Sequence, residues 1–244
     1  MKNRVLEIAN LNVQFNGRPV LSNINMVLEK AWVAAVVGPN GGGKTTLLRV
    51  ILGMLKPKTG DISVFGLSPK QAVARGLVGY LPQKLNRKPL PLTALEVVML
   101  PGGINKTQAL EALETMGVKD LANRSFWHLS GGQAQRVSLA RVIARKPGLM
   151  LLDEPNTGID TVSQEDFYKL LLQLREQSGI TVLMTTHDVG GVSSFVDQVF
   201  CLNVKMHCHG SASKCITPQN LSQLYGRDVD LLYHPPGGLD HGDS

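Results

Sequence analysis

One stretch decides the fold of this chain: Gly38-Pro39-Asn40-Gly41-Gly42-Gly43-Lys44-Thr45. It fits the pattern G-x-x-x-x-G-K-[ST] of a phosphate-binding loop. The apolar run 32–37 before it predicts a buried strand, and residues 46–52 after it predict a helix. In such a unit, loop amides and the free N–H groups of the helix start surround phosphates. We expect Lys44 to reach the β- and γ-phosphates, Thr45 to place its hydroxyl on Mg²⁺, and the neighbouring Thr46 to contact the nucleotide.

A second apolar run, 149–152, leads directly into Asp153 and Glu154. Ligands of open α/β sheets bind at the carboxyl ends of the strands, so both carboxylates are expected beside the phosphates. Asp153 fits the residue that holds Mg²⁺, next to Thr45 or through water. Glu154 fits the base that polarises an attacking water. A pair of strand-end carboxylates is an ordinary feature by itself, and the upstream loop is what favours catalysis.

His187 follows a third apolar strand, predicted over residues 181–186. A lone histidine is more often structural. Its place at the end of a strand, beside Asp188, favours contact with the γ-phosphate or the attacking water.

The segment Leu129-Ser130-Gly131-Gly132-Gln133 predicts a second anion site. Ser130 can cap a helix that begins near Gln133, and two glycines there leave bare amides facing outward. One chain rarely needs two γ-phosphate sites, whereas a head-to-tail dimer uses both. Each nucleotide would then lie between the phosphate loop of one chain and Ser130–Gly132 of the other. The alternative is a capped helix with a flexible lead-in.

The remaining patterns predict an α/β chain interrupted by helices. Residues 5–15 predict an edge strand or a hairpin, and 20–28 a further strand. A helical block at about 84–146 interrupts the core, and strands return at 149–152, 181–186 and 198–203. The domain is expected to span residues 1–230. The end of the chain, 231–244, is expected to be a flexible tail because it is rich in glycine, proline and aspartate.

Composition excludes several classes of protein. The chain has 244 residues, 43% of them hydrophobic, and a net charge of +6. No dense basic run accompanies this charge, so we expect no nucleic-acid partner. The first residues lack the long apolar stretch of a signal peptide, and no run approaches the ~20 apolar residues of a membrane span.

Three cysteines, Cys201, Cys208 and Cys215, lie near the end of the chain. An odd count without a C-x-x-C pair argues against a disulfide framework and against common zinc modules. We therefore expect reduced thiols in a cytosolic protein. Strand alternation sends His207 and His209 to one face and Cys208 to the other, so these three residues are not expected to bind one metal ion.

In their order along the chain, the motifs resemble those of the ATP-binding subunits of ABC transporters, over about residues 4–225. The segment 38–45 is similar to Walker A, 129–133 to the LSGGQ signature, and 149–154 to Walker B with its catalytic glutamate. This resemblance implies an α/β fold with a RecA-like P-loop core, an N-terminal antiparallel β subdomain and an inserted α-helical subdomain. The cofactors would be ATP and Mg²⁺.

The resemblance also assigns roles to four single residues, of which His187 is already named above. Gln83 would be the Q-loop glutamine, at the metal ion and the site of hydrolysis, and His187 the switch histidine. Phe15 would stack on adenine, although a phenylalanine buried in a strand is the alternative. Asp160 would contact the nucleotide site from the D-loop, whose sequence here departs mildly from the usual pattern of the family.

The resemblance also implies partners. Two ATP molecules would join two identical subunits, and hydrolysis would separate them and drive integral membrane permease subunits. The chain would then lie at the cytoplasmic face of the inner or plasma membrane as a peripheral subunit. The basic residues Lys84, Arg87 and Lys88 are expected near the membrane.

The zinc and manganese uptake branch of this family has segments similar to residues 80–85 and 89–94, and its zinc importers in particular have segments similar to 199–203 and 206–210. This favours import of a divalent metal ion, zinc or manganese, delivered by an extracytoplasmic metal-binding protein. The alternatives are an ATPase for another cargo, such as an iron chelate or an exported lipid, a soluble non-transport ABC ATPase, and a nucleotide-binding regulator without turnover. Soluble members usually join two cassettes or insert a coiled coil, and neither occurs here. Glu154 and His187 speak against a regulator.

Overall fold

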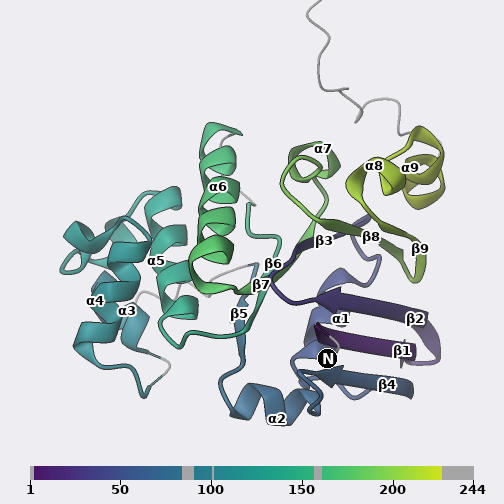
Figure 1. The fold of residues 1–244 in the computed structure, drawn as a ribbon, viewed down its shortest axis with the longest axis horizontal. Helices are drawn as coiled ribbons and strands as arrows, with labels where there is room; N and C mark the ends of the chain where they lie inside the picture. The colour runs from purple at the N-terminus through teal and green to yellow at the C-terminus, as the bar shows by residue number, and fades with distance from the viewer. Residues whose placement is uncertain (1–2, 84–90, 101, 157–160, 227–244) are drawn as a thin grey trace, which may run out of the picture.

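The computed structural model describes residues 3–83, 91–100, 102–156 and 161–226. Two sheets organise it (Figure 1). The larger has six strands in the order β5-β6-β7-β3-β8-β9, and the smaller has three in the order β2-β1-β4. The strands of the large sheet are β3 (Val33–Val37), β5 (Val78–Leu81), β6 (Leu149–Asp153), β7 (Thr181–Thr186), β8 (Gln198–Asn203) and β9 (Lys205–Gly210).

Five strands of the large sheet run parallel, and β9 returns antiparallel to β8. Every residue of β3, β6 and β7 is buried, as apolar runs in a sheet covered on both faces require. Along β3, Val33, Ala35 and Val37 belong to one hydrophobic cluster, and Ala34 and Val36 to the other. The sheet therefore separates two cores, and its carboxyl edge carries the loops that follow β3, β6 and β7.

The small sheet is antiparallel and consists of β1 (Arg4–Phe15), β2 (Arg18–Glu29) and β4 (Thr59–Val64). The hairpin of β1 and β2 confirms one of the two predictions for residues 5–15. The other, an edge strand, is wrong, because β1 lies in the middle and pairs with β4 on its second side. Alternation along β1 shows which face is buried but says nothing of a partner that lies about 50 residues later.

The helices are α1 (Lys44–Ile51), α2 (Pro69–Ala74), α3 (Ala94–Met99), α4 (Lys106–Thr115), α5 (Gly131–Ile143), α6 (Thr161–Ser178), α7 (Val189–Val192), α8 (Ala212–Cys215) and α9 (Pro218–Tyr225), with 3-10 turns at Lys119–Leu121 and Phe126–His128. Helices α3, α4 and α5 contact one another and stand on the side of the molecule away from the small sheet (Figure 1). The predicted α/β fold, with an antiparallel β subdomain and an inserted helical subdomain, is confirmed. Among the described helices, none is both long enough and apolar enough to cross a membrane.

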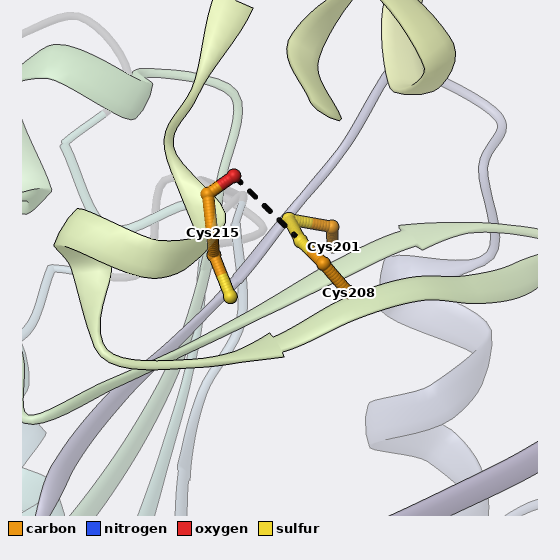
Figure 2. Close-up of side chains that lie close together, drawn as sticks. All are labelled: Cys201, Cys208 and Cys215. Carbon is orange, nitrogen blue, oxygen red and sulfur yellow. Dashed lines mark hydrogen bonds between the residues drawn. A yellow bond between two sulfur atoms is a disulfide. The ribbon is translucent and has the colours of Figure 1, made fainter. Parts of the chain in front are cut away.

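The expectation of reduced thiols is wrong for two of the three cysteines. Cys201 on β8 and Cys208 on β9 lie directly opposite each other and form a disulfide (Figure 2). An odd cysteine count cannot exclude such a pair, because the hairpin alone sets the two residues face to face. Cys215, in α8, stays free and buried, and this burial raises the pKa of its thiol. The predicted alternation of β9 is confirmed: His207 and His209 are exposed, and Cys208 is half-buried on the opposite face.

Three groups of sequence predictions lie outside the described residues. These are the D-loop residue Asp160, the basic residues Lys84, Arg87 and Lys88, and the tail 231–244.

Candidate active site

The predicted phosphate loop connects β3 to α1, as the sequence indicated. Two of its glycines are required by their surroundings. A Cβ atom on Gly38 would overlap the carbonyl oxygen of Leu202 on the neighbouring strand β8. Gly43 caps α1 with φ near +100°, and a Cβ there would lie 2.8 Å from the carbonyl oxygen of Val20. The loop is thus held between β8 and the start of β2, and its residues Asn40 and Gly41 are exposed.

Lys44 begins α1, and its side chain is only 5% exposed. Its ammonium donates to the carbonyl oxygens of Gly38, at 2.8 Å, and Pro39, at 3.1 Å. The carboxylate of Glu154 lies 3.4 Å away. A buried ammonium with three donors requires partners of this kind. Lys44 therefore folds back over the loop and pairs with the carboxylate at the end of β6.

Asp153, the last residue of β6, is 2% exposed and surrounded by hydroxyl groups. Its Oδ1 accepts from Thr45 Oγ1 at 3.1 Å and from Thr185 Oγ1 at 2.7 Å. Its Oδ2 accepts from the Tyr80 hydroxyl at 3.4 Å. Burial and the nearby Asp153 charge raise the pKa of Tyr80 to about 12, so Tyr80 remains a neutral donor. The Thr45 hydroxyl and the Asp153 carboxylate are hard oxygen ligands held side by side, which suits Mg²⁺.

Thr185 and Tyr80 were not predicted from the sequence. Thr185 lies on β7 directly opposite Asp153, and Tyr80 lies on β5, the strand on the other side of β6. The order of the strands decides both contacts. The available signal was a threonine near the end of a predicted strand, which becomes informative only when that strand is known to pair with the one carrying the aspartate.

Glu154 follows β6 and brings the predicted catalytic residues together. Its Oε2 accepts from Gln83 Nε2 at 2.5 Å and lies 3.7 Å from His187 Nδ1. Its N–H group bonds to both the carbonyl and the hydroxyl oxygen of Thr185, at 3.1 and 3.0 Å. The φ angle of Glu154 is +45°, an uncommon value for a residue with a side chain. These backbone bonds hold it in that conformation and direct its carboxylate towards Lys44.

The environment of Glu154 is open on one side. Its own side chain is 11% exposed, whereas that of His187 is 59% exposed, and Gln83 is also exposed. A carboxylate held between an ammonium, an amide and an imidazole, next to solvent, can accept a proton from a water molecule.

The Ser130 turn starts α5 with a capping box. Gln133 N–H donates to Ser130 Oγ at 3.3 Å, and Ser130 N–H donates to Gln133 Oε1 at 3.1 Å. The predicted capping role of Ser130 is therefore confirmed, although α5 begins at Gly131, two residues before the predicted start. A Cβ atom on Gly131 or Gly132 would meet nothing within 4 Å, so this chain alone does not require glycine there. Gln135, one turn into α5, donates to the Pro155 carbonyl at 2.6 Å and links the helix to the segment after Glu154.

Phe15 ends β1 and is 46% exposed. The alternative prediction of a buried core phenylalanine is wrong. The same hairpin contacts the phosphate loop, because Val20 and Leu21 at the start of β2 lie against Gly43. An exposed aromatic ring on this hairpin is free to stack on a planar ligand.

Comparison with known proteins places the chain in one family. The profile of the ABC transporter family matches residues 21–157. The chain is 39% identical to the zinc import ATP-binding protein ZnuC of Pseudomonas aeruginosa, over 96% of this chain and 85% of that protein.

Two solved structures illustrate the fold. A transporter assigned to the metal-chelate ABC type, in an inward-facing conformation, matches with a TM-score of 0.81 and 30% identity, covering 91% of this chain and 89% of that one. A dimeric bacterial ABC transporter cassette matches with a TM-score of 0.75 and 28% identity, covering 85% and 98%. The same cassette has been solved with ADP and phosphate.

A family profile that matches more than half of the chain, and a relative 39% identical along nearly all of it, lead to one conclusion. This chain belongs to the ABC transporter family, as a unit that binds and hydrolyses ATP.

Proposed function

We propose that residues 38–46 bind the phosphates of ATP, and that Thr45 and Asp153 hold the accompanying Mg²⁺ ion, with Gln83 at its open side. One observation carries this proposal: Lys44, Thr45, Asp153 and Glu154 form one connected group at the carboxyl edge of the large sheet. Phe15 supports the adenine, and Asp160, outside the described residues, is proposed to contact the nucleotide site. When bound, Mg²⁺ would neutralise charge on the phosphate oxygens.

Hydrolysis follows from the surroundings of Glu154. A water molecule beside its carboxylate loses a proton to Glu154 as the water oxygen attacks the γ-phosphorus and the bond to the ADP oxygen breaks. The Lys44 ammonium is placed to compensate charge on the phosphates, in exchange for its present bonds to Gly38 and Pro39. Gln83 and His187, both in contact with Glu154 and both exposed, orient the water and the γ-phosphate.

The functional unit is proposed to be a homodimer with two shared nucleotide sites. The support is the Ser130 turn, where Ser130 and Gly131 are exposed and glycine side-chain positions face open space. Glycine there admits close approach of a phosphate to the bare amides at the start of α5. A related bacterial cassette has been solved as a dimer, which supports the proposal on an independent ground.

Replacing Ser130 with arginine is expected to block ATP-dependent dimerisation and to leave nucleotide binding by the single chain unchanged. The arginine would fill the space in front of α5 and remove the cap. The change is best measured by size-exclusion chromatography with ATP in the hydrolysis-deficient Glu154→Gln background. Ser222→Arg, at an exposed position of α9, is the matched control. Unimpaired dimerisation of the Ser130→Arg chain would contradict the shared-site proposal.

The cargo is proposed to be zinc, moved inward through integral membrane permease subunits. The support is the likeness to proteins named zinc import ATP-binding proteins, over nearly the whole chain. In this proposal the chain is peripheral at the cytoplasmic face of the membrane, and an extracytoplasmic metal-binding protein delivers the ion. Manganese and iron chelates are the competing cargoes.

Deleting this protein is expected to lower the zinc content of cells grown under zinc limitation and to leave manganese and iron near parental levels. Elemental analysis of washed cells measures all three metals together. Complementation with the parental chain should restore zinc, and complementation with Glu154→Gln should not. A fall in manganese or iron with unchanged zinc would show that the cargo is that metal and not zinc.

A further inference from the structure

A cluster of three sulfur atoms lies outside the nucleotide site. The Sγ atoms of Cys201, Cys208 and Cys215 all lie within 4.8 Å of one another. They come from three consecutive elements, β8, β9 and α8, which fold over one another at the end of the large sheet (Figures 1 and 2). The disulfide uses two of these sulfurs and leaves the third beside it.

We propose that the chain, with its Cys201–Cys208 bond reduced, binds one Zn²⁺ ion through the thiolates of Cys201, Cys208 and Cys215. This site shares no residue with the proposed nucleotide site. It also does not depend on the cargo, because it concerns an ion held by the ATPase itself.

The spacing of the sulfurs suits the ion. A tetrahedral Zn²⁺ with zinc–sulfur bonds of about 2.3 Å separates its sulfur ligands by about 3.8 Å. The separations within the cluster fall within 4.8 Å, and the Cα atoms of Cys201 and Cys208 are 5.0 Å apart. Opening the disulfide to the metal-bound spacing therefore needs side-chain rotation but no rearrangement of the hairpin.

The burial of the three cysteines would shield a bound Zn²⁺ ion on one side and leave it a path of entry on the other. Cys201 and Cys215 are buried, at 0% and 1% exposure, and Cys208 is half-buried. The ion can enter from the Cys208 side, where a water molecule completes the fourth position. The nearby His207 and His209 are exposed on the other face of β9 and do not compete for the ion.

Formation of the site takes two steps, reduction of the disulfide and then binding of the metal ion. A phosphine reductant and one water molecule convert the disulfide into two thiols, and the phosphine becomes a phosphine oxide. The three thiols then release three protons as the three Zn–S bonds form. A thiolate set of this kind selects Zn²⁺ over Mg²⁺, which prefers oxygen ligands.

The site lies directly behind the phosphate loop. Cys201 is paired in register with Val37, the residue before Gly38. After β8, the N–H group of Val204 donates to the Gly42 carbonyl at 3.0 Å. A metal ion at this position would fix the hairpin against which the loop rests.

The test is a zinc titration of the full chain, reduced with a phosphine and freed of metal, against a chromophoric chelator. Excess Mg²⁺ and ADP are present to keep the nucleotide site filled. We expect one Zn²⁺ per chain. Loss of an outer partner of a metal site lowers affinity by about 10–100-fold, so Cys208→Ser and Cys215→Ser should each lower it by more than about 100-fold. The matched control, His207→Gln/His209→Gln, should bind like the parental chain.

A second measurement needs no substitution. Reduced parental chain titrated with Co²⁺ should show a thiolate-to-cobalt charge-transfer band, and the disulfide form should not. The proposal is overturned if this band is absent, if the cysteine variants bind Zn²⁺ as tightly as the parental chain, or if only the histidine variant loses binding. Retained ADP affinity in each variant shows that the chain has folded, whatever the metal result.

Discussion

Replacing Glu154 with glutamine is expected to lower the rate of ATP hydrolysis by about 10² or more, because a positioned general base contributes about 10²–10⁴. Glutamine has nearly the same shape and keeps the backbone bonds between residue 154 and Thr185. It cannot accept a proton from water. ATP binding should therefore persist, and the ATP-bound dimer should accumulate because the step that separates it is blocked.

Two measurements check this expectation together. Phosphate release under saturating ATP gives the rate, and size-exclusion chromatography with ATP gives the fraction of dimer. Glu165→Gln, on the exposed face of α6, is the control for loss of a carboxylate elsewhere. Hydrolysis at the parental rate in Glu154→Gln would show that another group takes the proton. His187, 3.7 Å from Glu154, would be the first residue to examine.

The predictable part of the fold was encoded locally. Strands β3, β6 and β7 were recognised from apolar runs, since a strand buried on both faces has no polar side to conceal it. The central place of β1 was not predictable, because it depends on pairing with β4 across the intervening β2, β3 and α1. Helix α2 was missed because only one of its six residues, Ala72, is buried, so its sequence carries no apolar period.

The candidate site also has residues that were predictable from local sequence and residues that were not. Lys44, Thr45, Asp153 and Glu154 were found because each lies at a fixed offset from an apolar run. Thr185 and Tyr80 reach Asp153 only through the order of the strands, and the three cysteines meet only because β9 folds back on β8 and α8 follows. A single sequence gives the ends of strands more readily than it gives which strands are neighbours.

Replacing Lys44 with alanine is expected to weaken ATP binding by about 100-fold or more. A charge-assisted hydrogen bond contributes about 1.5–3 kcal/mol, and the ammonium would make contacts to both the β- and γ-phosphates. Losing about 3 kcal/mol corresponds to roughly a 100-fold change in affinity. Titration with a fluorescent ATP analogue measures this loss. Lys70→Ala, a lysine at the start of α2, is the control.

The Lys44→Ala variant must also be checked for folding, so that a loss of ATP affinity is not caused by unfolding. In the structure, the Lys44 ammonium donates to the carbonyl oxygens of Gly38 and Pro39 and forms an ion pair with Glu154. Its loss leaves the Glu154 carboxylate without that ion pair, so the thermal midpoint of unfolding should be recorded beside the affinity. A stable fold with lost ATP affinity is the expected result, because α1 and β3 still bury their apolar faces. If the variant binds ATP like the parental chain, the phosphates are bound elsewhere, and the assignment of residues 38–45 fails with it.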